Sequence, residues 1–104
     1  MTREEIRDLQ AGPDLDKIVA EKITGAHLKI PPYSTDIAAA MEITSRFDWV
    51  NLLKGQAGLW VCTLRQYEGL QYRETQAVSR ELPESICKAA LMAVLPEAPG
   101  SNSK

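Results

Sequence analysis

The chain has 104 residues, of which 44% are hydrophobic and 25% charged, so it fits one domain that can fold without a disulfide or metal. Twelve Lys and Arg residues are spread among fourteen Asp and Glu residues, and this balance excludes the basic surface that nucleic-acid binding needs. The first ten residues contain no apolar signal core and no apolar run reaches about 18 residues, which predicts a cytoplasmic protein without a membrane segment.

Two helices are predicted in the first 25 residues. Thr2 and Glu5 have the spacing of a capping box, which predicts a short helix that buries Ile6. Pro13 fits the first position of a second helix, because its missing N–H is not needed there. Apolar residues then recur at helical spacing until Gly25, a favourable residue for ending a helix.

The stretch PPYSTDIAAA has two interpretations. Its prolines exclude a continuous helix, so a loop is expected before Ser34 or Thr35 caps a helix that runs to about Phe47. Asp36 would lie in the first turn, where a negative charge suits the helix dipole. The inner stripe would consist of Ile37, Ala40, Met41 and Thr44. Alternatively, the same hydroxyl and backbone N–H groups could hold an anion.

The segments WVNLL, GLWVCTL and QYRETQ predict a three-stranded antiparallel meander. A two-residue turn at Glu68 and Gly69 would pair Tyr67 with Leu70 and Arg65 with Tyr72. One sheet face would then carry Val61, Thr63, Arg65, Tyr67 and Tyr72, and the other would bury Trp60, Cys62 and Leu64. Because both faces are substantially apolar, we expect helices on both sides.

A last helix is predicted to begin near Pro83 and to turn Ile86 and Ala90 toward the sheet. The polar, Pro- and Gly-rich segment 96–104 is predicted to be a disordered tail after a single domain over residues 1–95. The two cysteines, Cys62 and Cys87, lie in apolar surroundings and are expected to be buried free thiols.

No catalytic, metal or cofactor motif emerges. The one histidine, His27, could be combined with Ser34 and Asp36, but the strand–turn–helix motif of a nucleophilic serine is missing. Glycine-rich phosphate loops and metal-ligand clusters are also missing. We therefore expect a protein that is not an enzyme and needs no cofactor, with a small hydrolase as the least favoured alternative.

A group of cationic and aromatic side chains is predicted around the second hairpin. Arg65 shares a sheet face with Tyr67 and Tyr72, and Arg73 is adjacent in sequence. These residues could stack on and neutralise a nucleotide-like ligand. They could equally form a cross-strand cation–π pair on a covered sheet.

The combination of AGPDLDKIVAEKI, YSTDIAAA and ICKAAL resembles the phage ABA sandwich domain family. This resemblance implies an α+β fold, a three-layer α/β/α sandwich in which helices flank an antiparallel sheet of about three or four strands. It also implies origin in a bacteriophage or prophage.

The resemblance further implies a non-enzymatic phage accessory protein. Some small phage proteins resemble anti-defence sponges, homo-oligomers that bind and sequester nucleotide-derived host immune signals such as cyclic nucleotides or ADP-ribose derivatives. By analogy, the ligand-binding residues would be Tyr33, Ser34, Thr35, Asp36, Arg65, Tyr67, Tyr72 and Arg73. The alternative is a protein-interaction module that inhibits a host protein or serves a phage assembly.

Overall fold

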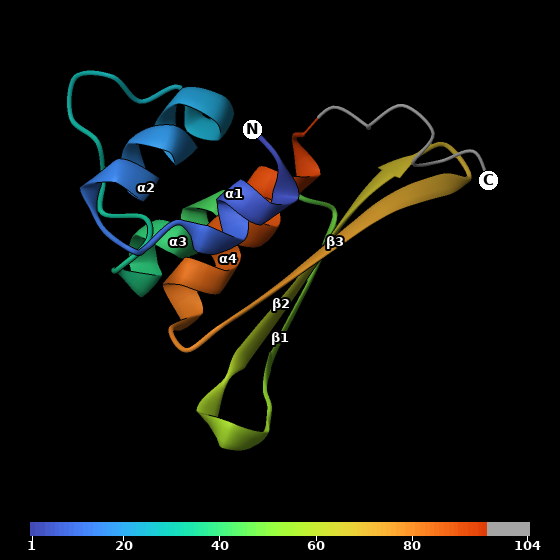
Figure 1. The fold of residues 1–104 in the computed structure, drawn as a ribbon. Helices are drawn as coiled ribbons and strands as arrows, with labels where there is room; N and C mark the ends of the chain where they lie inside the picture. The colour runs from blue at the N-terminus through green and yellow to red at the C-terminus, as the bar shows by residue number, and fades with distance from the viewer. Residues whose placement is uncertain (96–104) are drawn as a thin grey trace.

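Helices come first and last among residues 1–95, and a β-meander lies between them (Figure 1). The computed structural model describes residues 1–95, so the predicted disordered tail lies outside the described residues. The elements are α1 (Arg3–Asp8), α2 (Pro13–Val19), the π-helical segment η1 (Ala20–Thr24), α3 (Ile37–Thr44), β1 (Trp49–Lys54), the 3-10 turn η2 (Gln56–Gly58), β2 (Trp60–Glu68), β3 (Gln71–Ser79) and α4 (Leu82–Ala93). Within residues 1–95, no helix combines the length and the apolar character needed to cross a membrane.

The predicted signals at the first two helices are confirmed. Thr2 and Glu5 form a reciprocal capping box, and Pro13 opens α2. Gly25 ends η1 in the left-handed conformation with φ 79°, which a glycine adopts without the steric conflict of a Cβ atom.

The sheet is the predicted antiparallel meander, with β2 between β1 and β3. The turn between β2 and β3 differs from the prediction, because it contains Gly69 and Leu70 and pairs Tyr67 with Tyr72. Gly69 has φ 66° at the first central position, the place of glycine in a type II′ turn. Because the register moves by two residues, the predicted side-chain faces of β2 and β3 are unchanged.

All described helices lie on one side of the sheet (Figure 1). Helix α4 rests on β2 and β3, and α1, α2 and α3 each contact α4. Thr75 of β3 ties the two layers together by donating its hydroxyl proton to the Ala89 carbonyl over 2.9 Å. The α+β class with an antiparallel sheet and packed helices is confirmed. Within residues 1–95, the helical layer expected on the Arg65 side of the sheet is not present.

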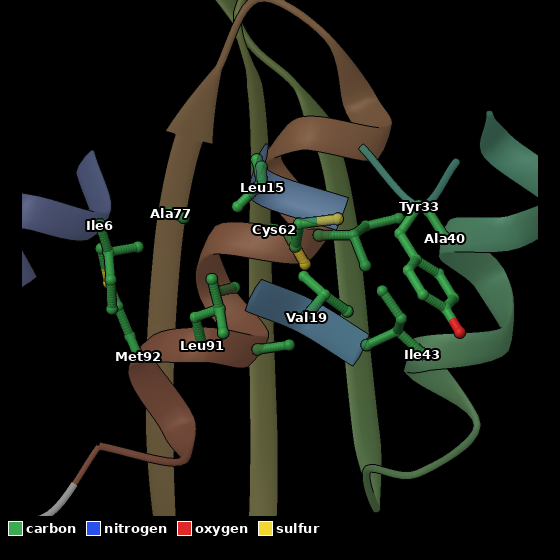
Figure 2. Packing of buried hydrophobic residues seen from close by; sticks show 14 of the residues in the cluster. Ile6, Leu15, Val19, Tyr33, Ala40, Ile43, Cys62, Ala77, Leu91 and Met92 are labelled. Carbon is green, nitrogen blue, oxygen red and sulfur yellow. The ribbon is translucent and has the colours of Figure 1, made fainter. Parts of the chain in front are cut away.

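The core lies between the sheet and the helices (Figure 2). Cys62 and Leu64 project from β2 into it, as predicted, and Trp60 at the end of the strand is half-buried. Helix α4 is enclosed on almost every side, since nine of its residues are buried. The predicted buried free thiols are confirmed, and burial raises the pKa of Cys62 to about 12 and that of Cys87 still further.

Helix α3 is rotated relative to its predicted orientation. Its buried residues are Ala40, Ile43 and Thr44, whereas Ile37 and Met41 are 53% and 43% exposed. The predicted inner stripe was therefore wrong at these two positions. The rotation follows from the segment before the helix, because Tyr33 and Ser34 are buried and fix the direction in which the chain enters α3.

Candidate functional site

The predicted site residues divide between two separate regions. Tyr33, Ser34, Thr35 and Asp36 lie on the helical side of the molecule, in the segment before α3. Arg65, Tyr67 and Tyr72 project from β2 and β3 toward the uncovered side of the sheet. The structure therefore does not bring the two predicted groups together into one site.

Ser34 is a structural anchor inside the protein. Its side chain is fully buried, and both its backbone N–H and its hydroxyl donate to Asp16 Oδ1 at 2.7 Å. The Gly12 N–H donates to Ser34 Oγ at 2.8 Å, which joins the loop to the start of α2. These bonds connect residues 18 and 22 positions apart, so no local sequence pattern indicates them.

Asp36, rather than Ser34 or Thr35, caps α3. Its side chain accepts a hydrogen bond of 3.1 Å from the Ala39 N–H, and its own backbone is extended. The predicted capping residue was therefore wrong by one or two positions, because Ser34 is already committed to Asp16. Thr35 is exposed beside it.

A wide-open surface cavity of about 440 Å³ lies beside Tyr33, between the loop that follows η1 and the C-terminal end of α3. Lys29 and Arg46 supply two positive charges to its lining, His27 an imidazole and Glu42 one carboxylate. The sequence interpretation found Tyr33 but missed the two cations, because Lys29 and Arg46 are 17 positions apart and only the folded loop brings them to one cavity.

The wall of this cavity is shaped by η1. The Gly25 N–H donates to the Ala20 carbonyl at 2.7 Å, five residues back, which closes a wider turn than that of an α-helix. Thr24 then accepts a hydrogen bond of 2.9 Å from the Tyr33 hydroxyl. Tyr33 is only 2% exposed and lies beside Ala40 and Ile43 of α3, so it contributes to the cavity as part of a fixed wall (Figure 2).

The second region is a stack of side chains on the uncovered sheet face. The Arg65 guanidinium lies over the Trp49 ring at 4.2 Å and over the Tyr72 ring at 4.5 Å. Its Nε donates to Glu74 Oε1 at 2.7 Å, and this bond raises the pKa of Arg65. Arg65 is thus already stacked and paired within the protein.

The two tyrosines complete this region, and Arg73 does not belong to it. Tyr67 and Tyr72 meet edge to face with ring centroids 5.7 Å apart. Arg73 pairs with Gln66, so it alternates to the opposite face, where its guanidinium donates to the Leu95 carbonyl at 2.7 Å. The sequence indicated the Arg65–Tyr72 contact but missed Trp49 and Glu74, whose positions depend on the strand register.

The described residues 1–95 contain no group of three or more His, Cys, Asp or Glu side chains arranged to hold a metal ion. The three residues considered for hydrolysis also do not assemble. Ser34 bonds to Asp16, Asp36 caps α3, and the His27 ring lies 3.3 Å from the Gly25 carbonyl in an exposed loop.

The fold and its surfaces define a small α+β domain with a cavity on its helical side and a stacked aromatic face on its sheet. The sequence profile of the phage ABA sandwich domain matches residues 14–91, and the chain belongs to this family. A crystal structure of a phage protein from Bacillus cereus ATCC 14579 has a similar fold, with a TM-score of 0.61 and 22% identity over 86% of this chain and 96% of that chain. None of the curated proteins matches the chain. The family is one of phage proteins, so the chain is a small phage protein.

Proposed function

We propose that this phage accessory protein binds a small nucleotide-derived host signal, a cyclic nucleotide or an ADP-ribose derivative, and holds it without chemical change. Sequestration requires a site with charge for phosphate groups, and it does not require a nucleophile or a general base. The protein would compete with the host receptor for the signal, so a slow off-rate rather than turnover would make it effective.

The observation that carries this proposal is the cavity beside Tyr33. Its volume of about 440 Å³ lies in the range of small-molecule sites, roughly 300–1,000 Å³. Arg46 can bind a phosphate through two parallel N–H groups, and Lys29 adds a compact positive charge at the same cavity. Glu42 can accept hydrogen bonds from ribose hydroxyls or from a base amine.

The test is ligand retention by the purified protein. ADP-ribose and a cyclic dinucleotide are each mixed with the protein, the bound fraction is separated and denatured, and the released compound is identified by mass spectrometry. Intact ligand in an amount proportional to the protein supports sequestration. Cleaved product in excess of the protein would instead make it a hydrolase.

Matched variants locate the site. Arg46→Ala and Lys29→Ala should each weaken retention about tenfold or more, because each removes a charge-assisted contact to phosphate. Lys22→Ala is the control, since Lys22 is exposed on η1 and does not line the cavity. If Arg65→Ala alone weakened binding, the ligand would lie on the sheet face, where stacking on Tyr67 and Tyr72 was predicted.

The second candidate function is a protein-interaction module that inhibits a host protein or serves a phage assembly. The observation that favours it is the exposed aromatic stack, because Trp, Tyr and Arg are the residues most enriched at the centres of protein interfaces. Under this alternative, none of the candidate nucleotides would be retained, and Arg65→Ala would abolish capture of a phage or host protein.

A further inference from the structure

The uncovered side of the sheet has an ordered arrangement of side chains. We call it the open face; it consists of the outward-pointing residues of β1, β2 and β3, and the strand pairing places them in rows across the sheet. One end row is apolar, with Leu53, Val61 and Val78. The opposite end row is aromatic, with Tyr67 and Tyr72. Four of these five side chains are about half exposed, at 46% to 59%.

The two middle rows differ in polarity. The first contains the uncharged polar residues Asn51, Thr63 and Gln76. The second contains Trp49, Arg65 and Glu74, in which the two charges neutralise each other through the 2.7 Å ion pair. The open face is therefore electrically neutral in a chain whose net charge is -2, and two copies of it do not repel each other.

Two copies of this face can stack with their strands antiparallel or parallel. In the antiparallel arrangement, a twofold axis crosses β2 near Leu64, so each apolar row meets an aromatic row. Thr63 then faces the partner's Arg65. In the parallel arrangement, each row meets its own copy, and Arg65 faces the partner's Arg65. Two guanidinium groups that face each other across the interface repel, which disfavours the parallel arrangement. The order of the rows therefore favours the antiparallel arrangement. These pairings hold best at the central strand β2, because the rotation of about 30° between packed sheets moves its side chains least.

We propose that the open face is a homodimer interface in which a second copy of this chain packs its open face with the strands antiparallel. The two apolar rows cover the two tyrosine pairs, and the polar rows lie against the Arg65 stacks. This gives an isologous contact of the kind that most homodimers use. It also accounts for the half-exposed apolar and aromatic side chains of the open face, which no helix of residues 1–95 covers.

The size of the open face sets the expected stability of the dimer. Strands β2 and β3 have nine residues each and β1 has six, so at about 3.3 Å per residue and about 4.8 Å between strands the face covers at most about 30 by 14 Å, roughly 400 Å² in projection. A standard interface buries about 800 Å² per partner, so we expect a dimer that dissociates on dilution. The cavity beside Tyr33 is lined by η1, the following loop and α3, and no strand residue lines it, so both copies keep it accessible. The dimer does not depend on the nucleotide proposal.

The experiment is sedimentation equilibrium across micromolar to millimolar concentrations, where the mass should rise from 11.5 kDa toward twice that value. A pair of opposite charges at position 63 then tests the arrangement. Thr63→Arg should weaken dimerisation about tenfold or more, because it faces the partner's Arg65. Thr63→Glu should dimerise at least as tightly as the original chain, because it faces the same cation. Met41→Arg and Met41→Glu on the exposed side of α3 are matched controls that should change nothing.

Circular dichroism spectra and melting curves establish that each variant is folded before its mass is measured. A chain that stays at 11.5 kDa throughout the concentration range overturns the proposal. Equal weakening by Thr63→Arg and Thr63→Glu overturns the antiparallel arrangement, because that result places position 63 against its own copy. If neither Thr63→Arg nor Thr63→Glu changes dimerisation, or if the Met41 substitutions abolish it, the interface is not the open face and the proposal is overturned.

Discussion

Ser34→Ala should destabilise the protein strongly, although it removes a single oxygen atom. The substitution deletes the 2.7 Å hydrogen bond to Asp16, and bonds to charged groups contribute about 1.5–3 kcal/mol. It also leaves the Gly12 N–H without its 2.8 Å acceptor, a loss of about 1 kcal/mol at this partly buried position. The sum is about 3 kcal/mol, a large part of the roughly 5–15 kcal/mol that stabilises a domain.

The assay is urea denaturation followed by tryptophan fluorescence, supported by a melting curve that should move down by about 10–20 °C. Thr35→Ala is the matched control, because Thr35 is the exposed neighbour of Ser34, and we expect a change within about 0.5 kcal/mol. In a double-mutant cycle with Asp16→Ala, the two losses should be strongly non-additive. Equal stability of Ser34→Ala and Thr35→Ala would refute the anchoring role and return Ser34 to the list of ligand-binding candidates.

Three further predictions concern the helices and the core. Asp36→Ala should cost about 1 kcal/mol in urea denaturation while Asp36→Ser costs little, because serine can still cap α3; equal losses would contradict the capping role. Lys88→Met should cost about 2 kcal/mol, since it removes the 2.8 Å bond to the Arg7 carbonyl and leaves Glu84 unpaired, and adding Glu84→Gln should recover part of that loss. Because burial raises the pKa of Cys62 from 9.0 to about 12, the native state binds more protons than the unfolded state between these values. The contribution of Cys62 to stability is thus fully present below pH 9.0 and is lost toward about pH 12, and a Cys62→Ala variant should show a shallower decline over that range.

The predictions from sequence succeeded where the signal is local. Alternation in β2 correctly placed Cys62 and Leu64 in the core and Arg65 on the opposite face. The misplaced hairpin turn did not change these faces, because it moved the strand register by an even number of residues. The capping box at Thr2 and the helix end at Gly25 depend on neighbours within a few positions, and both are confirmed.

Apart from the turn after β2, which was misplaced by one residue, the failures of prediction depend on distant partners. In the sequence Ser34 has the features of a helix cap, but in the structure its hydroxyl bonds to Asp16 and Asp36 caps α3 instead. The burial of Tyr33 and Ser34 fixes how the chain enters α3 and leaves Met41 exposed. The cavity lined by Lys29 and Arg46 could not be predicted from the sequence either, because a loop of irregular backbone has no periodicity that would indicate where its side chains point.

The central position of α4 has a consequence for how the protein is made. This helix contacts β2, β3 and all three other α-helices, yet among residues 1–95 it is the last regular element to leave the ribosome. Earlier segments have no common surface to pack on until residues 82–93 emerge, so this domain should fold only after α4 has left the ribosome. Products that stop before α4 lack the centre of the core, and cellular proteases should remove them while full-length chains persist.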